Sequence, residues 1–133
     1  MRRGIVVALI IGCLCSCGAG VWIAREAMIA PFVLPGASDL VVTPHGLDDL
    51  GIDYRANAGS FAWRDRMSQR LSAMGWRGRL YTFGSRTPFT LTSYTHELEL
   101  GPFTLTEHAI VGGSPEDPNA VRVRVYHELH LRR

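Results

Sequence analysis

A run of 21 residues without a charged side chain, Gly4 to Ala24, dominates the start of the sequence. Arg2 and Arg3 precede the run, and Arg25 and Glu26 come directly after it. As an α-helix it would be roughly 31 Å long, about the thickness of a bilayer's hydrocarbon core. Three interpretations fit it: a transmembrane helix, a lipoprotein signal, and a cleaved secretory signal with Met1-Arg2-Arg3 as its basic region.

The transmembrane interpretation is supported by small residues that recur every four positions along the run. They would form a continuous stripe on one helix face, where small side chains let membrane helices approach closely. We therefore expect the stripe to pack against transmembrane helices of other subunits. Its members are Ala8, Gly12, Ser16, Gly20 and Ala24.

The lipoprotein interpretation depends on cysteines inside the same run. Ile10-Ile11-Gly12-Cys13 resembles the lipobox of bacterial lipoproteins, and Leu14-Cys15-Ser16-Cys17 resembles it less closely. This resemblance to a bacterial exported, membrane-anchored protein implies lipidation at Cys13 or Cys17. No cysteine occurs after Cys17, so the rest of the chain has no disulfide.

All three interpretations export the rest of the chain, because the basic residues before the run place the N-terminus in the cytoplasm. The expected location is the bacterial cell membrane, crossed once, with the C-terminal domain outside. We divide the chain into a membrane segment (1–25), an interfacial linker (26–38) interrupted by prolines, and an extracytoplasmic domain (39–133).

The extracytoplasmic domain alternates between strand and helix patterns. Trp63, Met67, Leu71 and Met74 form an apolar stripe that predicts a helix over 60–74, with Gly75 as its left-handed C-terminal residue. Period-two alternation and β-branched runs predict strands at 40–43, 50–55, 80–83, 89–99, 103–111 and 121–131. The expected fold class is α+β: one N-terminal transmembrane helix, then a small antiparallel sheet packed against a single amphipathic helix.

Histidines and carboxylates are the candidates for chemistry. In the last strand His127 and His130 must point to opposite faces, so they cannot share a metal ion. His96-Glu97 and Glu107-His108 are expected to face each other across a hairpin turning at Gly101-Pro102. No nucleophile elbow, phosphate loop or dinucleotide fingerprint occurs. We expect no enzyme activity, no cofactor and no metal.

The basic side chains are the best functional candidates, and all 14 are arginine. Clustered guanidinium groups suit anionic lipid headgroups or an acidic protein surface, and export argues against nucleic acid. The sequence thus predicts a non-enzymatic accessory subunit of a membrane complex, similar in layout to one-helix subunits of bacterial respiratory and photosynthetic assemblies. The alternative is a lipoprotein with an envelope-facing binding domain. The expected contact residues are Arg64, Arg66, Arg70, Arg77 and Arg79.

Overall fold

The fold is that of a computed structural model, which describes Gly18, Trp22 and residues 25–46, 49–57, 62–83 and 89–131. The chain divides into two units, residues 1–30 and 31–133, and the sheet and its helix belong to the second. The predicted helix-packing residues and the lipobox cysteines lie outside the described residues.

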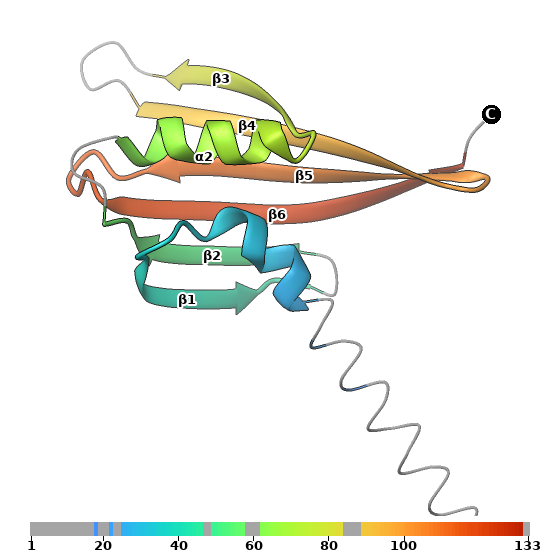
Figure 1. Cartoon of the computed structure of the whole chain (residues 1–133), viewed down its shortest axis with the longest axis horizontal. Helices are drawn as coiled ribbons and strands as arrows, with labels where there is room; N and C mark the ends of the chain where they lie inside the picture. The colour runs from blue at the N-terminus through green and yellow to red at the C-terminus, as the bar shows by residue number, and fades with distance from the viewer. Residues whose placement is uncertain are drawn as a thin grey trace, which may run out of the picture. The chain divides into compact units, whose positions relative to one another are not determined.

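A six-stranded antiparallel sheet forms most of the second unit (Figure 1). Its spatial order is β1-β2-β6-β5-β4-β3, so β1 and β3 are the two edges. Each strand predicted from the sequence is present, with bounds a few residues wider. The strands are β1 (Ser38–Pro44), β2 (Asp49–Arg55), β3 (Arg77–Phe83), β4 (Phe89–Leu100), β5 (Phe103–Gly113) and β6 (Ala120–Leu131).

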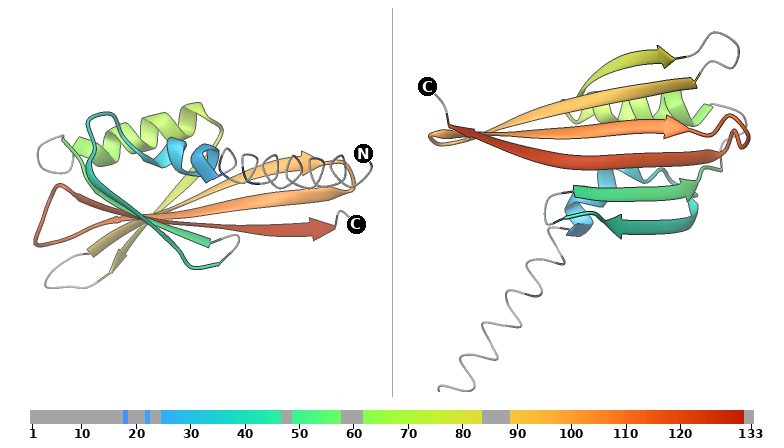
Figure 2. Two further views of the ribbon diagram at one scale, coloured as in Figure 1. Left: turned by 90° about the horizontal axis from the view of Figure 1, so that it is seen from below. Right: turned by 180° about the vertical axis from the view of Figure 1, so that it is seen from behind.

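Helix α2 (Ala62–Ala73) crosses one face of this sheet (Figure 2, left). Three members of the predicted stripe, Trp63, Met67 and Leu71, are buried. The fourth, Met74, is 44% exposed because the helix ends before it. Gly75 has φ +88°, and the Trp76 amide donates to the Leu71 carbonyl at 3.0 Å. This is a Schellman C-terminus, as the glycine predicted, and it directs the chain into β3.

The core lies between α2 and the sheet. Rows of side chains cross the sheet beneath the helix, and one row joins Tyr94, Ala109, Val125 and Leu50 in register. All four are at most 5% exposed. Gly78 lies opposite Tyr94 on β3, and a Cβ there would come within 2.7 Å of the tyrosine ring. The glycine therefore lets Tyr94 lie across β3.

The segment before β1 packs against the same core. Phe32 is 1% exposed and meets the Trp76 ring edge-on at 5.2 Å. The Tyr54 hydroxyl donates to the Phe32 carbonyl at 2.9 Å, and Arg70 Nε donates to the Pro31 carbonyl at 3.0 Å. Burial raises the pKa of Tyr54 to about 12. Two backbone carbonyls that do not take part in the hydrogen bonding of the sheet thus accept hydrogen bonds from side chains.

The predicted fold class is wrong. Instead of a transmembrane helix followed by a small sheet on one amphipathic helix, the described residues form one dominant six-stranded sheet with two short helices, η1 (Ala30–Phe32) and α2. Within the described part of the chain, no helix has the length and apolar character needed to cross a membrane. The sheet dominates because β4, β5 and β6 each continue for 11 or 12 residues, well past the short helix.

Candidate functional site

The five predicted arginines do not form one surface. On α2, Arg64 Nη2 donates to the Thr90 carbonyl at 3.5 Å and its guanidinium lies 5.2 Å from the Trp63 ring, while Arg66 is exposed. Arg70 Nε donates a hydrogen bond to the Pro31 carbonyl. Burial lowers the pKa of Arg64. Two of the three helix arginines therefore contact the domain's own backbone.

The other two arginines, Arg77 and Arg79, lie on edge strand β3. Gly78 faces the Tyr94 side chain, which is buried in the core between α2 and the sheet, so Gly78 faces the helix. Alternation along the strand then directs Arg77 and Arg79 to the opposite face of the sheet. Both are exposed, and the Arg79 guanidinium lies 5.4 Å from the Tyr81 ring.

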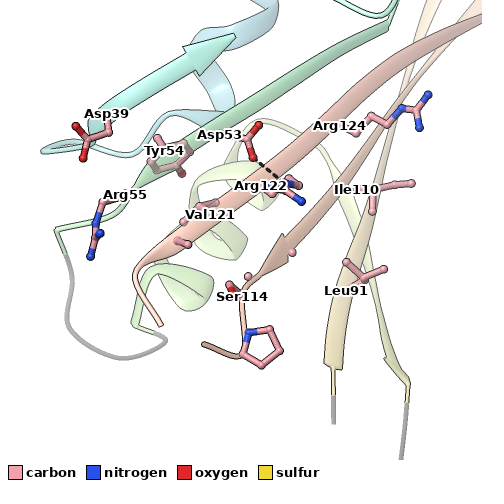
Figure 3. A pocket seen from close by; sticks show the side chains of 14 residues that line it. Asp39, Asp53, Tyr54, Arg55, Leu91, Ile110, Ser114, Val121, Arg122 and Arg124 are labelled. Carbon is pink, nitrogen blue, oxygen red and sulfur yellow. Dashed lines mark hydrogen bonds and ion pairs between the residues drawn. The ribbon is translucent and has the colours of Figure 1, made fainter. Parts of the chain in front are cut away.

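The face of the sheet away from α2 carries a hollow of about 580 Å³, with Gly112 and Gly113 among its lining residues (Figure 3). Leu91 and Ile110 line its apolar side. Arg122 Nε donates to Asp53 Oδ1 at 2.7 Å across the β2–β6 ladder. These groups come from neighbouring strands that alternation aims at the same face.

Each arginine at the hollow pairs with a carboxylate of the same domain. Arg124 donates twice to Asp49, at 3.1 and 2.7 Å, and Arg55 lies 3.3 Å from Asp117. The hydrogen bond from Arg124 lowers the pKa of Asp49. The hydrogen bond to Asp53 in turn raises the pKa of Arg122. Because each of these arginines already has a carboxylate, the pairs contribute to sheet pairing more than to attraction of an ionic ligand.

A row of three polar side chains crosses the helix-facing side of β4, β5 and β6. His96 Nδ1 lies 2.8 Å from Glu107 Oε2, and His127 Nε2 lies 3.2 Å from Glu107 Oε1. The carboxylate accepts a hydrogen bond from each imidazole. Trp76 stacks on His96 at 5.2 Å. The prediction that His96-Glu97 and Glu107-His108 face each other across the hairpin is correct for His96 and Glu107, which His127 joins. Glu97 instead pairs with Thr106, and His108 pairs with Thr95.

These three side chains, which we name the junction row, mark where the sheet narrows. On one side β3 pairs with β4 only up to Thr95, and on the other β2 pairs with β6 only up to Tyr126. Beyond the junction row three of the described strands, β4, β5 and β6, continue past the end of α2 (Figure 1). We call this projection, residues 97–106 and 128–131, the tip.

The tip exposes an apolar face. Register places Leu98, Leu105 and Leu129 side by side, with Leu100, Phe103 and Leu131 in the next row. These positions continue the helix-facing side of the sheet, since each lies four or six residues along its strand from a member of the buried row of Tyr94, Ala109 and Val125. Five of the six are strongly exposed: Leu98 38%, Leu100 51%, Phe103 40%, Leu129 60% and Leu131 65%. The largest contiguous apolar patch of a monomeric protein is often functional.

Sequence reasoning missed this face although its signal was available. The alternation of Leu129 and Leu131 with polar neighbours predicted which side they face, and that is correct. The signal for their exposure was length: the strands are too long for a 12-residue helix to cover.

His127 and His130 point to opposite faces as predicted, with His130 beside Glu128 at 3.2 Å. Among the described residues no group of three or more histidine, cysteine or acidic side chains is placed to hold a metal ion. The chain matches no protein-family model, no curated protein and no solved structure.

Proposed function

We propose that this chain is a non-enzymatic accessory subunit of a bacterial membrane protein complex, and that the tip is where it docks on another subunit. The observation that carries the proposal is the exposed apolar face of the tip, with five large side chains at 38–65% exposure. Exposed apolar surface favours association because burying it removes it from water.

The strands of the tip also lack flanking strands in the described part of the chain. Past the junction row neither β3 nor β2 accompanies them, so β4 and β6 become the outer strands of the sheet. A narrow sheet gains stability from packing against another element. A partner that covers the apolar face would supply what α2 supplies to the other half of the sheet.

The size of the face bears on the kind of partner. Its exposed side chains amount to something on the order of 400 Å² of apolar surface, against about 800 Å² per partner in a standard stable interface. A face this small binds stably when a second attachment holds the partner nearby. Anchoring of both proteins in one membrane, as the apolar run at residues 4–24 predicts, would provide that attachment.

The charge of the described residues at the tip favours a protein over lipid. The opposite face of the tip carries Glu97, Glu99 and Glu128, all exposed. Carboxylates repel the anionic headgroups that attract peripheral domains to bacterial membranes. The occupant of the apolar face is therefore proposed to be the extracytoplasmic part of another subunit.

The test is purification of the full chain from its own membranes in mild detergent, with identification of the proteins that remain bound. Leu129→Ser with Leu131→Ser should lose the bound partner. The matched control is Leu40→Ser with Val41→Ser, which removes apolar side chains of similar exposure, 47% and 56%, from β1. The control should keep the partner. Retention by the tip variant, or a wild-type chain that purifies alone, would contradict the proposal.

The mode of membrane attachment is a separate proposal with a separate readout. The lipoprotein alternative, with an envelope-facing binding domain, requires a lipidated Cys13 or Cys17 at the start of the mature chain. Intact mass of the same preparation distinguishes this form from a chain that retains Met1. The result decides the anchor and leaves the test of the tip unchanged.

A further inference from the structure

The two edges of the sheet differ in how they are protected. On β1 the register shifts between Ser38 and Val41, Asp39 has φ +55°, and Pro44 removes an amide donor. Bulges and prolines of this kind discourage a further strand from pairing. On β3 the register with β4 is continuous from Arg77 to Phe83, and the strand contains no proline.

The β3 edge is also accessible. Residues 77–82 are all exposed, and β3 is the last strand in the sheet order. Figure 1 shows β3 along the outer margin of the sheet, with β4 on its inner side only. Among the described strands, the seven-residue β3 therefore has one strand neighbour, β4.

The arginines of this edge differ from those at the hollow in their described partners. In the described part of the chain, carboxylates pair with Arg55, Arg122 and Arg124. No described carboxylate pairs with Arg77 or Arg79. Both arginines project from the face opposite α2, at alternate positions of one strand, while Leu80 projects from the other face with 63% exposure.

We propose that the β3 edge binds an extended acidic segment of a partner protein, which adds to the sheet as a seventh strand. In this mode main-chain hydrogen bonds provide affinity and alternate side chains provide specificity. Carboxylates at every second residue would lie beside Arg77 and Arg79, and apolar residues between them would lie beside Leu80. A second copy of β3 does not fit, because it would bring its own arginines to the same face.

The inference rests on the proposed function only in that the ligand is a protein; its site is distinct from the tip. The probe is a labelled seven-residue peptide in which glutamate alternates with valine, titrated against the full chain in mild detergent. The matched peptide has lysine in place of glutamate. The glutamate peptide should bind, and Arg77→Glu with Arg79→Glu should weaken its binding at least tenfold while strengthening binding of the lysine peptide.

Two controls separate pairing at this edge from general attraction to positive charge. Arg66→Glu reverses one charge at an exposed position on α2, half of the change in the double variant, and should leave binding within twofold of wild type. Two further glutamate peptides are N-methylated on alternate residues, one at the odd and one at the even positions. Each keeps its charge but loses the amide donors on one side of the strand. One of the two should lose binding and the other should keep it.

The proposal fails if the glutamate peptide does not bind, if the Arg77→Glu, Arg79→Glu variant binds it as wild type does, or if both methylated peptides bind equally. Equal binding of both would indicate a purely ionic contact such as an anionic lipid surface makes. The tip variant Leu129→Ser with Leu131→Ser should bind the peptide normally. Its loss of partners in membranes would then report on the tip alone, so each proposal can fail without the other.

Discussion

Strand β6 contains the same pattern twice with opposite outcomes. Val121, Val123 and Val125 are 2%, 0% and 1% exposed, whereas Leu129 and Leu131, on the same face of the same strand, are 60% and 65% exposed. Alternation fixes the face to which a side chain points. Burial of that face depends on the element that covers it.

The lengths of the elements explain where burial stops. Helix α2 has 12 residues and spans about 18 Å, whereas β6, also of 12 residues, spans about 40 Å. The helix can cover roughly half of the strand, and the loss of neighbours β2 and β3 occurs at the same place. In the covered half the apolar side chains are buried in a core, whereas the apolar side chains on the same face of the tip are mostly exposed.

The largest expected effect is the difference in the free energy of unfolding between leucine-to-alanine substitutions in the two regions. Leu71→Ala, at 0% exposure on α2, should lower the free energy of unfolding by about 2–5 kcal/mol, because it loses buried contacts and leaves a cavity. Leu129→Ala makes the same chemical change at the tip and should cost less than about 0.5 kcal/mol. Denaturant unfolding of both variants checks this. Similar costs would mean that the tip is already covered in the free protein.

Much of the covered half could be predicted from the sequence because its signals are local. The Trp63, Met67 and Leu71 stripe, the Gly75 terminus and the facing of His96 and Glu107 each depend on residue spacing within one or two elements. Spacing of this kind survives folding because helix and strand periods are fixed by backbone geometry.

The candidate surfaces could not be predicted in the same way because they depend on tertiary geometry. The arginines of α2 and β3 appeared as one group, yet the Arg64 bond to Thr90, the Arg70 bond to Pro31 and the outward facing of Arg77 separate them. Exposure of the tip results from the mismatch in length between a helix and three strands, a signal that is visible only when the lengths of several predicted elements are compared.

An alkaline titration tests the covered half through Tyr54. Burial raises its folded pKa to about 12, above the ordinary value of 10.0, so the folded state favours the protonated phenol. Its stabilising contribution is therefore complete below pH 10 and is lost as pH rises through 12. The expected loss is about 2–3 kcal/mol.

Denaturant unfolding from neutral pH to pH 12, with ultraviolet absorbance of the phenolate, measures this loss. Tyr54→Phe is the control: it should lose about 1 kcal/mol at neutral pH with the hydrogen bond to Phe32, and lose less than wild type on going to pH 12. An equal alkaline loss in both proteins would assign the pH dependence to another group.

The smallest effect is expected at the junction row, where the two regions meet. Glu107→Leu would continue the apolar face of the tip but leave His96 and His127 without their shared acceptor. Partly buried donors that lose a partner cost about 1–2 kcal/mol, so the variant should be destabilised by that amount. Replacing all three members of the row by leucine also removes the two imidazoles that lost this acceptor and should recover part of the loss, because an apolar row has no hydrogen bond to satisfy. Amide hydrogen exchange at residues 98–105 provides the deciding comparison. If the row anchors the tip to the core, Glu107→Leu should speed exchange in the tip and leave the strands beneath α2 unchanged, whereas uniform acceleration would mean that tip and core unfold as one unit.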